Sequence, residues 1–270
     1  MPYATNSLDG TRVYVEDDGG PGAPVVFYGG ILDSVVLVRR SSIARALQEL
    51  PDEFRLVYAD HRGLGQSDKP HDVGAYALPL QAADAVAVLD DLGLERAHFV
   101  GASYGGRLCF GIGQHAPERV LSLVAGGQQP YAIDPDGPLA QVIVGALDRT
   151  ASEGAVAFVE ALENYWHTRF PEPERTGYIE QDGAALAAMA GAMLTQGDVS
   201  PDLTSWTVPC LAYLGAGDVD FIEQAQRAAE EIPGMELITL DDLDHYGTHF
   251  LSLRVVPAVL QHLREHAGRD

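Results

Sequence analysis

Short apolar runs rich in β-branched residues alternate along this chain with longer stretches that have the periodicity of a helix. The strand-like runs lie at residues 11–16, 25–28, 56–59, 98–100, 121–125, 208–214 and 236–240, and the helix-like stretches at 39–50, 78–92, 104–116, 222–232 and 254–266. Strands that alternate with helices form βαβ units, in which helical crossovers join parallel strands. The sequence therefore predicts an α/β fold with a mostly parallel central sheet and helices on both of its faces.

The alternation stops between residues 129 and 205. This segment is helix-like, irregular and rich in proline, and it has no convincing strand. At 270 residues the chain is long for a single domain, but α/β folds often reach this size as one unit. We therefore predict one α/β core, formed by residues 1–128 and 206–270, with a helical insertion at 129–205.

The chain is strongly acidic. It has 39 aspartate and glutamate residues against 17 lysine and arginine residues, for a formal net charge of −22. A surface with this sign repels phosphate backbones and anionic lipids, so nucleic acid and membrane surfaces are not expected as partners. The expected partner is a small-molecule substrate, and the sequence leaves a homo-oligomer open.

Other compositional features indicate a cytoplasmic protein without a cofactor. Two cysteines cannot build a disulfide framework and are what a reducing compartment tolerates. The N-terminal residues have neither the basic nor the apolar region of a signal peptide, and no apolar stretch reaches the roughly 18–20 residues of a membrane span. No spacing of histidines, cysteines or carboxylates matches a metal site.

The sharpest local signal is the pentapeptide Gly-Ala-Ser-Tyr-Gly at residues 101–105, which a strand-like run precedes and a helix-like stretch follows. A serine at a tight strand-to-helix turn is exposed at the carboxyl edge of the sheet, and glycines two residues away on each side make room for the strained backbone. The helix N-terminus behind it favours developing negative charge. We interpret Ser103 as a nucleophile, with a plain glycine-rich turn as the alternative.

A serine hydroxyl needs a base to take its proton, and the base needs an acid to orient it. Asp218 is the favoured acid because it follows the strand-like run 208–214 and so lies at the same edge of the sheet. Asp220 is the alternative acid, and it also fits the N-cap of the next helix.

Among nine histidines, His245 is the favoured base because it lies beyond the carboxyl end of the strand-like run 236–240. His249, one helical turn later, is the alternative base. The chain order of Ser103, Asp218 and His245 is that of nucleophile, acid and base in this sheet topology.

With these residues the chain resembles the α/β-hydrolase superfamily over most of its length. Four pieces match that family in order: the nucleophile motif, the glycine pair after the run 25–28, Asp-His-Arg-Gly-Leu-Gly-Gln-Ser-Asp at 60–68, and the late acid and base. The third piece is similar to a stretch of esterases, epoxide hydrolases, haloperoxidase-like perhydrolases and carbon–carbon bond hydrolases. In this chain we expect the stretch to be a scaffold turn that Asp60 and Arg62 hold in place. The resemblance implies that residues 129–205 form a cap that covers the site and shapes the substrate pocket.

The resemblance also implies an oxyanion hole made of two backbone N–H groups. Relatives usually carry His-Gly after the corresponding strand, where this chain has Gly29-Gly30. We align Gly30 with their glycine, and we expect the N–H of Ile31 as one donor and the N–H of Tyr104 as the other. An alignment shifted by one residue would substitute Gly30 for Ile31. Backbone donors are insensitive to the side chain, so loss of the histidine does not remove the hole.

The predicted function is hydrolysis of a carboxylic ester, thioester or lactone of a small to medium molecule through an acyl-enzyme. We expect Gly30, Tyr165 and Trp166 to contact the substrate, with packing in an amphipathic helix as the alternative role of the two aromatic residues. Ser103 stands where epoxide hydrolases and haloalkane dehalogenases of the resembled fold use aspartate, which argues against both. Carbon–carbon bond hydrolysis, a perhydrolase activity and nonhydrolytic ligand sensing stay open, and the sequence does not identify the natural substrate.

Overall fold

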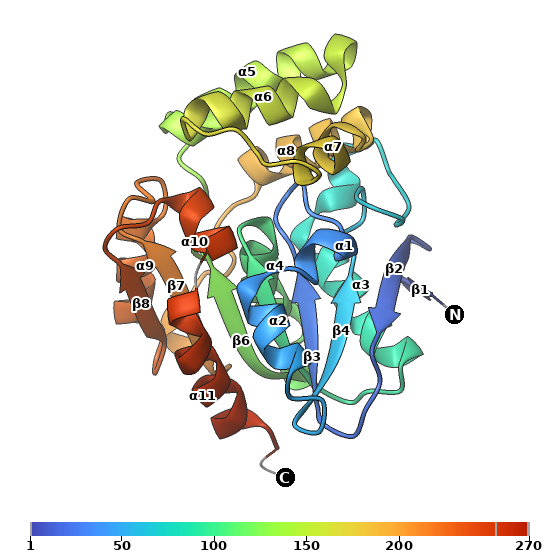
Figure 1. Ribbon diagram of the computed structural model, residues 1–270, viewed down its shortest axis with the longest axis vertical. Coiled ribbons are helices and arrows are strands. Elements are labelled where there is room, and N and C mark those ends of the chain that lie inside the picture. The colour runs from blue at the N-terminus through green and yellow to red at the C-terminus, as the bar shows by residue number, and fades with distance from the viewer. Residues whose placement is uncertain (1, 252, 269–270) are drawn as a thin grey trace.

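The structure is a computed structural model that describes residues 2–251 and 253–268, without the side chains of residues 151 and 249–251. Within this part of the chain, eight strands form one sheet in the order β1-β2-β4-β3-β5-β6-β7-β8 (Figure 1). The strands are β1 (Tyr3–Thr5), β2 (Arg12–Asp17), β3 (Ala23–Tyr28), β4 (Phe54–Ala59), β5 (Ala97–Ala102), β6 (Val120–Gly126), β7 (Cys210–Gly215) and β8 (Glu236–Leu240). β2 pairs antiparallel with β1 and β4, and the six strands from β4 to β8 in the sheet are parallel. The predicted mostly parallel sheet is confirmed.

The strand order reverses at β3, which lies between β4 and β5. Chain connections leave β3 toward one side of the sheet and later return to its other side, so the helices that follow β3 and β5 cover opposite faces. Ligands of open α/β sheets bind at such a switch point, outside the carboxyl ends of the strands. The loop after β3 and the turn after β5, which holds Ser103, therefore start side by side.

Helices cover both faces of the sheet, as predicted. The helices of the described residues are α1 (Val35–Val38), α2 (Ser42–Gln48), α3 (Leu78–Asp91), α4 (Tyr104–His115), α5 (Pro138–Glu153), α6 (Ala155–Tyr165), α7 (Glu174–Ile179), α8 (Gly183–Thr195), α9 (Ile222–Glu231), α10 (His245–Leu251) and α11 (Val256–His266), with short 3₁₀ turns at Val73–Tyr76, Pro117–Arg119, Leu203–Ser205 and Leu253–Val255. Successive side chains of a strand point to opposite faces. Accordingly Val25 and Phe27 of β3 pack with α1, α2 and α11, whereas Val26 and Tyr28 pack with α3, α4 and α9.

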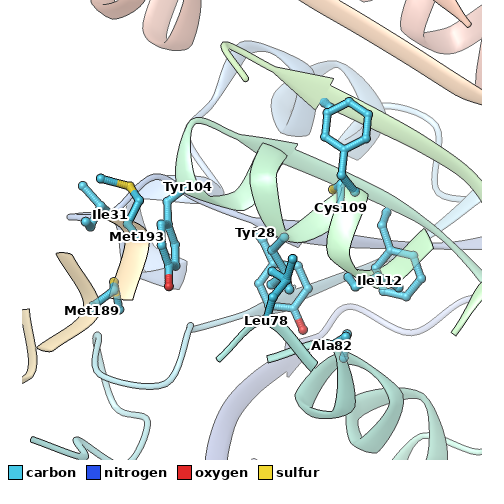
Figure 2. Packing of buried hydrophobic residues seen from close by; sticks show 14 of the residues in the cluster. Tyr28, Ile31, Leu78, Ala82, Tyr104, Cys109, Ile112, Met189 and Met193 are labelled. Atoms are coloured by element: carbon cyan, nitrogen blue, oxygen red, sulfur yellow. The ribbon is translucent and has the colours of Figure 1, made fainter. Parts of the chain in front are cut away.

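The chain between β6 and β7 forms the helices α5 to α8, which lie together beyond the carboxyl ends of the strands (Figure 1). α5 and α6 pack against each other, and α8 lies beneath them and contacts α5. Apolar residues on nearly every side of α8 suit a helix that is buried between two layers. Met189 and Met193 of α8 belong to the same apolar cluster as Ile31 and Tyr104, and Figure 2 shows these four side chains in one group. This helix therefore packs on the loop after β3 and on the start of α4.

Three expectations about local structure were wrong. The helix expected at 39–50 is shorter, α2 at Ser42–Gln48, because Ser41 is extended, with φ of −60° and ψ of 152°, and its hydroxyl accepts the N–H of Ala44 at 3.2 Å. A serine in this role caps a new helix, so α2 starts separately from α1. The expected final helix at 254–266 starts at Val256, after a separate α10, and Pro257 occupies its first turn. The edge strand β1 is only three residues long and was not expected.

Candidate active site

Ser103 lies at the turn between β5 and α4, in a strained backbone conformation with φ of 53° and ψ of −117°. The two flanking glycines have no room for a side chain. A Cβ on Gly101 would lie 2.1 Å from the carbonyl oxygen of Gly105, and a Cβ on Gly105 would lie 2.4 Å from the carbonyl oxygen of Tyr28. The turn is held by the N–H of Ser103, which donates to the carbonyl of Gly126 at 2.7 Å. This local packing raises the serine side chain from the end of the strand, at the start of a helix.

The structure brings together the three side chains that the sequence selects. Nε2 of His245 lies 3.0 Å from Oγ of Ser103, and Nδ1 of His245 lies 2.7 Å from Oδ2 of Asp218. Asp218 follows β7 and is 2% exposed, and His245 is the first residue of α10 and is 7% exposed. With the imidazole proton on Nδ1, His245 donates to the carboxylate and Nε2 can accept the serine hydroxyl. The arrangement can therefore withdraw a proton from Ser103.

The surroundings of His245 favour its charged form. Burial lowers the pKa of His245, but the charge of Asp218 and its hydrogen bond to the ring, followed by the charges of Asp220 and Asp244, raise the pKa above its ordinary value overall. A base with a raised pKa holds an abstracted proton more firmly, at the cost of activity in acid. The imidazolium that forms when Ser103 is deprotonated is thus stabilised by neighbouring carboxylates.

The two backbone groups predicted to hold an oxyanion belong to Ile31 and Tyr104. Ile31 lines the same pocket as Ser103, and Tyr104 is the first residue of α4, so its N–H is at a helix N-terminus. The Tyr104 side chain points away, and its hydroxyl donates to Oε1 of Gln81 at 2.9 Å. The N–H of Gly30 donates to Oδ2 of Asp33 at 2.7 Å. A substrate oxygen would compete with Asp33 for that donor, which favours Ile31 over Gly30.

The pocket at Ser103 is small and mostly apolar, with a volume of about 40 Å³. Its walls come from the loop after β3, from the 129–205 segment and from α10: Gly30, Ile31, Leu32, Asp33, Leu162, Trp166, Phe170, Tyr178, His245 and Tyr246. Trp166 also lines an adjoining hollow together with Tyr165, Asp218 and Asp220. A larger hollow of about 230 Å³ beside α1 and α2 does not include Ser103. The reactive groups, rather than size, therefore select the smaller pocket.

The structure describes the contacts of the alternative acid, Asp220, but not the side chain of the alternative base, His249. Asp220 accepts the hydroxyl of Tyr165 on Oδ2 at 2.7 Å and the N–H of Leu139 on Oδ1 at 3.3 Å, so both of its oxygens face the 129–205 segment. His249 belongs to α10, and its side chain lies outside the part that the structure describes.

The stretch 60–68 forms a buried support beneath the loop after β3. Asp60 accepts the N–H groups of Val35 and Gln66, and Nε2 of His61 lies 2.9 Å from the carbonyl oxygen of Gly29.

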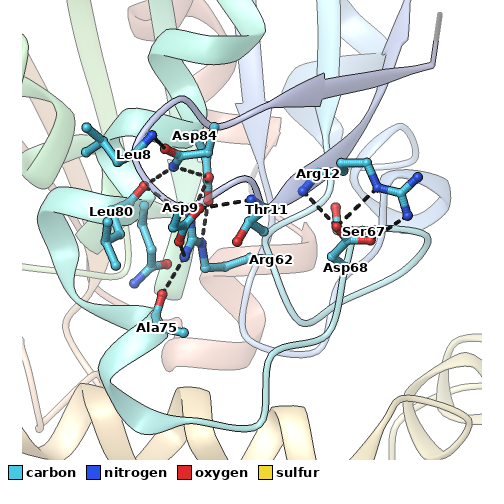
Figure 3. A network of polar contacts seen from close by, with 12 residues as sticks. Leu8, Asp9, Thr11, Arg12, Arg62, Ser67, Asp68, Ala75, Leu80 and Asp84 are labelled. Carbon is cyan, nitrogen blue, oxygen red and sulfur yellow. Dashed lines mark hydrogen bonds and ion pairs between the residues drawn. The ribbon is translucent and has the colours of Figure 1, made fainter.

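Figure 3 shows the partners of Arg62, which belongs to this stretch. It is fully buried and binds Asp84 through Nε and Nη2 at 2.7 and 2.6 Å, and Asp9 through Nη1 at 2.7 Å. Asp60 binds Val35, just after the loop that follows β3, whereas Arg62 links Asp84 of α3 to Asp9, and these contacts agree with the scaffold role expected for Asp60 and Arg62.

Sequence reasoning missed two contacts of the site. Asp33 accepts the hydroxyl of Tyr178, from α7, on Oδ1 at 2.9 Å, which joins the loop after β3 to the 129–205 segment. The indole of Trp166 stacks on the imidazole of His245, with ring centroids 5.3 Å apart and an interplanar angle of 17°. The aromatic residues near 165 were a signal for the second contact, whereas nothing in the sequence around Asp33 indicates the first.

Clustered metal ligands and membrane-spanning helices are not found in the described part of the chain. Among residues 2–251 and 253–268, no group of three or more histidine, cysteine, aspartate or glutamate side chains is placed as metal ligands would be. The described helices include none that is both long enough and apolar enough to cross a membrane.

Comparison with known proteins places this geometry in a family. A family model described as the alpha/beta hydrolase fold matches residues 23–177. The chain is 26% identical over 246 residues to epoxide hydrolase A of Mycobacterium tuberculosis, covering 90% of this chain and 67% of that protein. It is 24% identical to 3-oxoadipate enol-lactonase 1 of Acinetobacter baylyi, covering 77% of each. The solved structure of the enol-lactonase from Burkholderia xenovorans is similar with a TM-score of 0.81 at 22% identity, covering 97% of this chain and 100% of that chain.

These relatives are hydrolases, and the fold, the strained serine turn and the chain order of the site agree with the family match. Because that match spans more than half of the 270 residues and includes Ser103, the protein belongs to the alpha/beta hydrolase fold family.

Proposed function

We propose that the protein is a serine hydrolase that cleaves a carboxylic ester, thioester or lactone of a small to medium molecule through an acyl-enzyme. His245 takes the hydroxyl proton as Oγ of Ser103 attacks the carbonyl carbon, and it returns this proton to the leaving oxygen or sulfur. Water then loses a proton to His245 and attacks the acyl-enzyme, which releases the acid and restores the serine. Asp218 orients the imidazole and stabilises its charged form.

The negative charge that forms on the carbonyl oxygen is assigned to the N–H groups of Ile31 and Tyr104. Each such donor is worth roughly 10² to 10³ in turnover. Both donors are fixed before substrate arrives, because Ile31 lies in a loop braced by Asp33 and Tyr104 begins α4. The hole therefore needs no reorganisation during the reaction.

The observation that carries the proposal is the continuous hydrogen-bonded chain from Ser103 through His245 to Asp218, at 3.0 and 2.7 Å. Its chemistry also separates acyl transfer from epoxide opening. Attack of a serine oxygen on an epoxide carbon would leave an ether, which water does not readily cleave. Attack on a carbonyl carbon leaves an ester, which the same base can hydrolyse.

We assign residues 129–205 as a cap that closes over Ser103 and limits the size of the acyl group. The support is that Leu162, Trp166, Phe170 and Tyr178 of this segment form walls of the pocket. Trp166 contacts the pocket directly, whereas Tyr165 lines only the adjoining hollow. Apolar walls suit an acyl chain without charge, and the leaving group would extend toward the opening.

Turnover of p-nitrophenyl acetate and butyrate by wild type and by Ser103→Ala tests the proposal. Removing a triad serine should lower kcat by about 10⁶, the loss seen when subtilisin is deprived of its nucleophile. Ser152→Ala, at an exposed position of α5, is the matched control and should not change kcat. A Ser103→Ala variant that keeps its activity would refute the proposal. A wild type that turns over no ester of a broad panel but binds ligand saturably would indicate a sensor instead.

The assignment of the acid has its own test. Asp218→Asn should lower kcat by about 10⁴, because an amide favours the wrong imidazole tautomer, as the same change does in serine proteases with this triad. Asp220→Asn should have an effect at least about tenfold smaller, because Asp220 binds the cap and not the ring edge. Small and equal effects of the two substitutions would contradict the assignment.

A further inference from the structure

One carboxylate of the core loop after β7 holds two helices of the cap. Oδ2 of Asp220 accepts the hydroxyl of Tyr165, the last residue of α6, at 2.7 Å, and Oδ1 accepts the N–H of Leu139, in the first turn of α5, at 3.3 Å. An acidic side chain at the start of a helix is also favoured by the helix dipole. Asp220 therefore fixes the end of α6 next to the loop that carries Asp218.

The residue after this anchor lies on the catalytic imidazole. Trp166 caps the end of α6, and its N–H donates to the carbonyl of Leu162 at 3.0 Å, so its backbone is fixed relative to Tyr165. Its indole stacks on the ring of His245 with an interplanar angle of 17°. The position of the indole thus depends on the position of the Tyr165 anchor.

We propose that Asp220 is a positioning residue for His245, and that it acts through Tyr165 and Trp166. The proposal rests on the proposed function, because it explains how the general base is held. Asp218 holds the ring at one edge, through Nδ1, Nε2 lies 3.0 Å from Oγ of Ser103, and the tilted ring of Phe221 has its centroid 5.6 Å from that of the imidazole. The indole packed on the face of the ring adds a further constraint on rotation about the bond to Asp218 and keeps Nε2 directed at Ser103.

The charge of Asp220 and its hydrogen bond have separate consequences. The hydrogen bond positions the Tyr165 side chain, whereas the charge of Asp220 is one of several that raise the pKa of His245. The titratable groups around the imidazole are Asp33, Ser103, Tyr165, His167, Tyr178, Asp218, Asp220, Asp244 and Tyr246. Asparagine at position 220 keeps an acceptor and removes the charge, and Tyr165→Phe keeps the charge and removes the hydrogen bond. The two effects can therefore be measured independently.

Kinetics with p-nitrophenyl butyrate form the first test. Tyr165→Phe should lower kcat by about tenfold or more, because displacing a catalytic group by 1 Å can cost about 100-fold, and it should leave the apparent pKa in kcat/KM unchanged. Asp220→Asn should keep most of kcat and lower that apparent pKa, and Asp220→Ala should show both changes. Glu223→Gln removes an exposed carboxylate three residues along the chain and should change neither quantity.

Fluorescence provides a readout that needs no turnover. The chain has two tryptophans, so Trp206→Phe leaves Trp166 as the reporter. A charged imidazole quenches an indole stacked on it, so emission should fall as pH is lowered through the pKa of His245. Tyr165→Phe should weaken this quenching, and Asp220→Asn should move its midpoint to lower pH.

The outcomes separate this inference from the proposed function. If Ser103→Ala is inactive but Tyr165→Phe keeps both kcat and the quenching, then Asp220 has no positioning role and the inference is wrong. If Ser103→Ala retains activity, the proposed function is wrong, while the fluorescence still shows whether Asp220 holds Trp166 on the ring. Parallel loss of kcat and of quenching in Tyr165→Phe, with folding intact by circular dichroism, supports the inference.

Discussion

The N–H of Gly105 donates to the carbonyl of Gly29 at 2.9 Å, which ties the first turn of α4 to the end of β3. Tyr104 of α4 and Ile31 of the loop after β3 carry the two backbone groups assigned to the oxyanion hole. The bond is short enough only because residue 105 lacks a side chain. One backbone hydrogen bond therefore constrains the distance between the start of α4 and the loop after β3.

Gly105→Ala tests this relationship. The new Cβ would lie 2.4 Å from the carbonyl oxygen of Tyr28 and 2.6 Å from that of Gly29, so α4 must move away from the loop. We expect a loss of kcat of about 100-fold or more, on the scale of one lost oxyanion donor, together with a lower melting temperature.

Gly145→Ala is the matched control, because it lies inside α5 with nothing within 4 Å of the added carbon. It should raise stability by about 0.5–1 kcal/mol, since alanine is the better helix former, and leave kcat unchanged. An active Gly105→Ala with normal stability would show that the contact does not set the geometry of the hole.

Arg62 provides a prediction about folding. Its buried, bidentate pair with Asp84 supports the scaffold turn (Figure 3). Arg62→Met leaves the Asp84 carboxylate buried without its charged partner, so it should destabilise the protein by about 3–5 kcal/mol in urea unfolding.

The exposed pair of Arg12 and Asp68 is the control, with side chains 59% and 37% exposed. Arg12→Met should not change the urea midpoint beyond the error of measurement, because exposed ion pairs contribute little. Equal effects of Arg12→Met and Arg62→Met would contradict the assignment of Arg62 as a structural anchor.

The placement of Ser103, Asp218 and His245 could be predicted because each follows a strand of one parallel sheet. The carboxyl ends of parallel strands meet at the same edge, so topology brings distant residues together without knowledge of packing. The sheet itself was predictable from the period of the apolar residues. The positions of these residues at one edge of the sheet could therefore be predicted from their places after the strands in the sequence.

The contacts that the 129–205 segment makes could not be predicted in this way. Its helices pack through tertiary contacts that no local period specifies, so the stacking of Trp166 on His245 and the bond from Tyr178 to Asp33 could not be foreseen. The start of α2 at Ser42 could not be predicted for a different reason. Ser41 is compatible with a helix interior as well as with a cap, and only the folded backbone decides between them.

Three buried histidines should make the fold sensitive to acid. Burial lowers the pKa of His61 to about 4, that of His98 to about 3 and that of His262 to about 4. The unfolded chain protonates these rings near pH 6.5 whereas the folded chain does not, so stability is lost as pH falls from about 6.5 toward 4. Asp60 opposes this trend, because burial raises its pKa to about 6 and the folded chain takes up its proton first. Burial also lowers the pKa of His115 and raises that of Asp84, so four groups against two predict a net loss in this window.

Urea unfolding at pH 7.5, 6 and 5 measures that loss. His98→Gln keeps a side chain able to bond Ser122, whose Oγ lies 2.8 Å from Nδ1 of His98, but it does not titrate. The slope of stability against pH should therefore be shallower in this variant. A slope as steep as that of wild type would show that His98 does not remain neutral in the fold.

The walls of the pocket predict selectivity between acyl groups of equal shape. The described wall carries aromatic and aliphatic side chains and one carboxylate, Asp33, and no lysine or arginine among the lining residues. A carboxylate on the acyl chain would lose its hydration there without gaining a lysine or arginine, while His245 is neutral when it acts as the base, and the carboxylate would be repelled by Asp33. The p-nitrophenyl ester of 4-methylpentanoic acid and the half-ester of succinic acid place an isopropyl group and a carboxylate at the same position. We expect kcat/KM to be about 100-fold or more higher for the first, since an unpaired buried charge costs several kcal/mol. A half-ester that reacts as fast as its neutral isostere would require a cation in the pocket and would overturn the assignment of an uncharged acyl group.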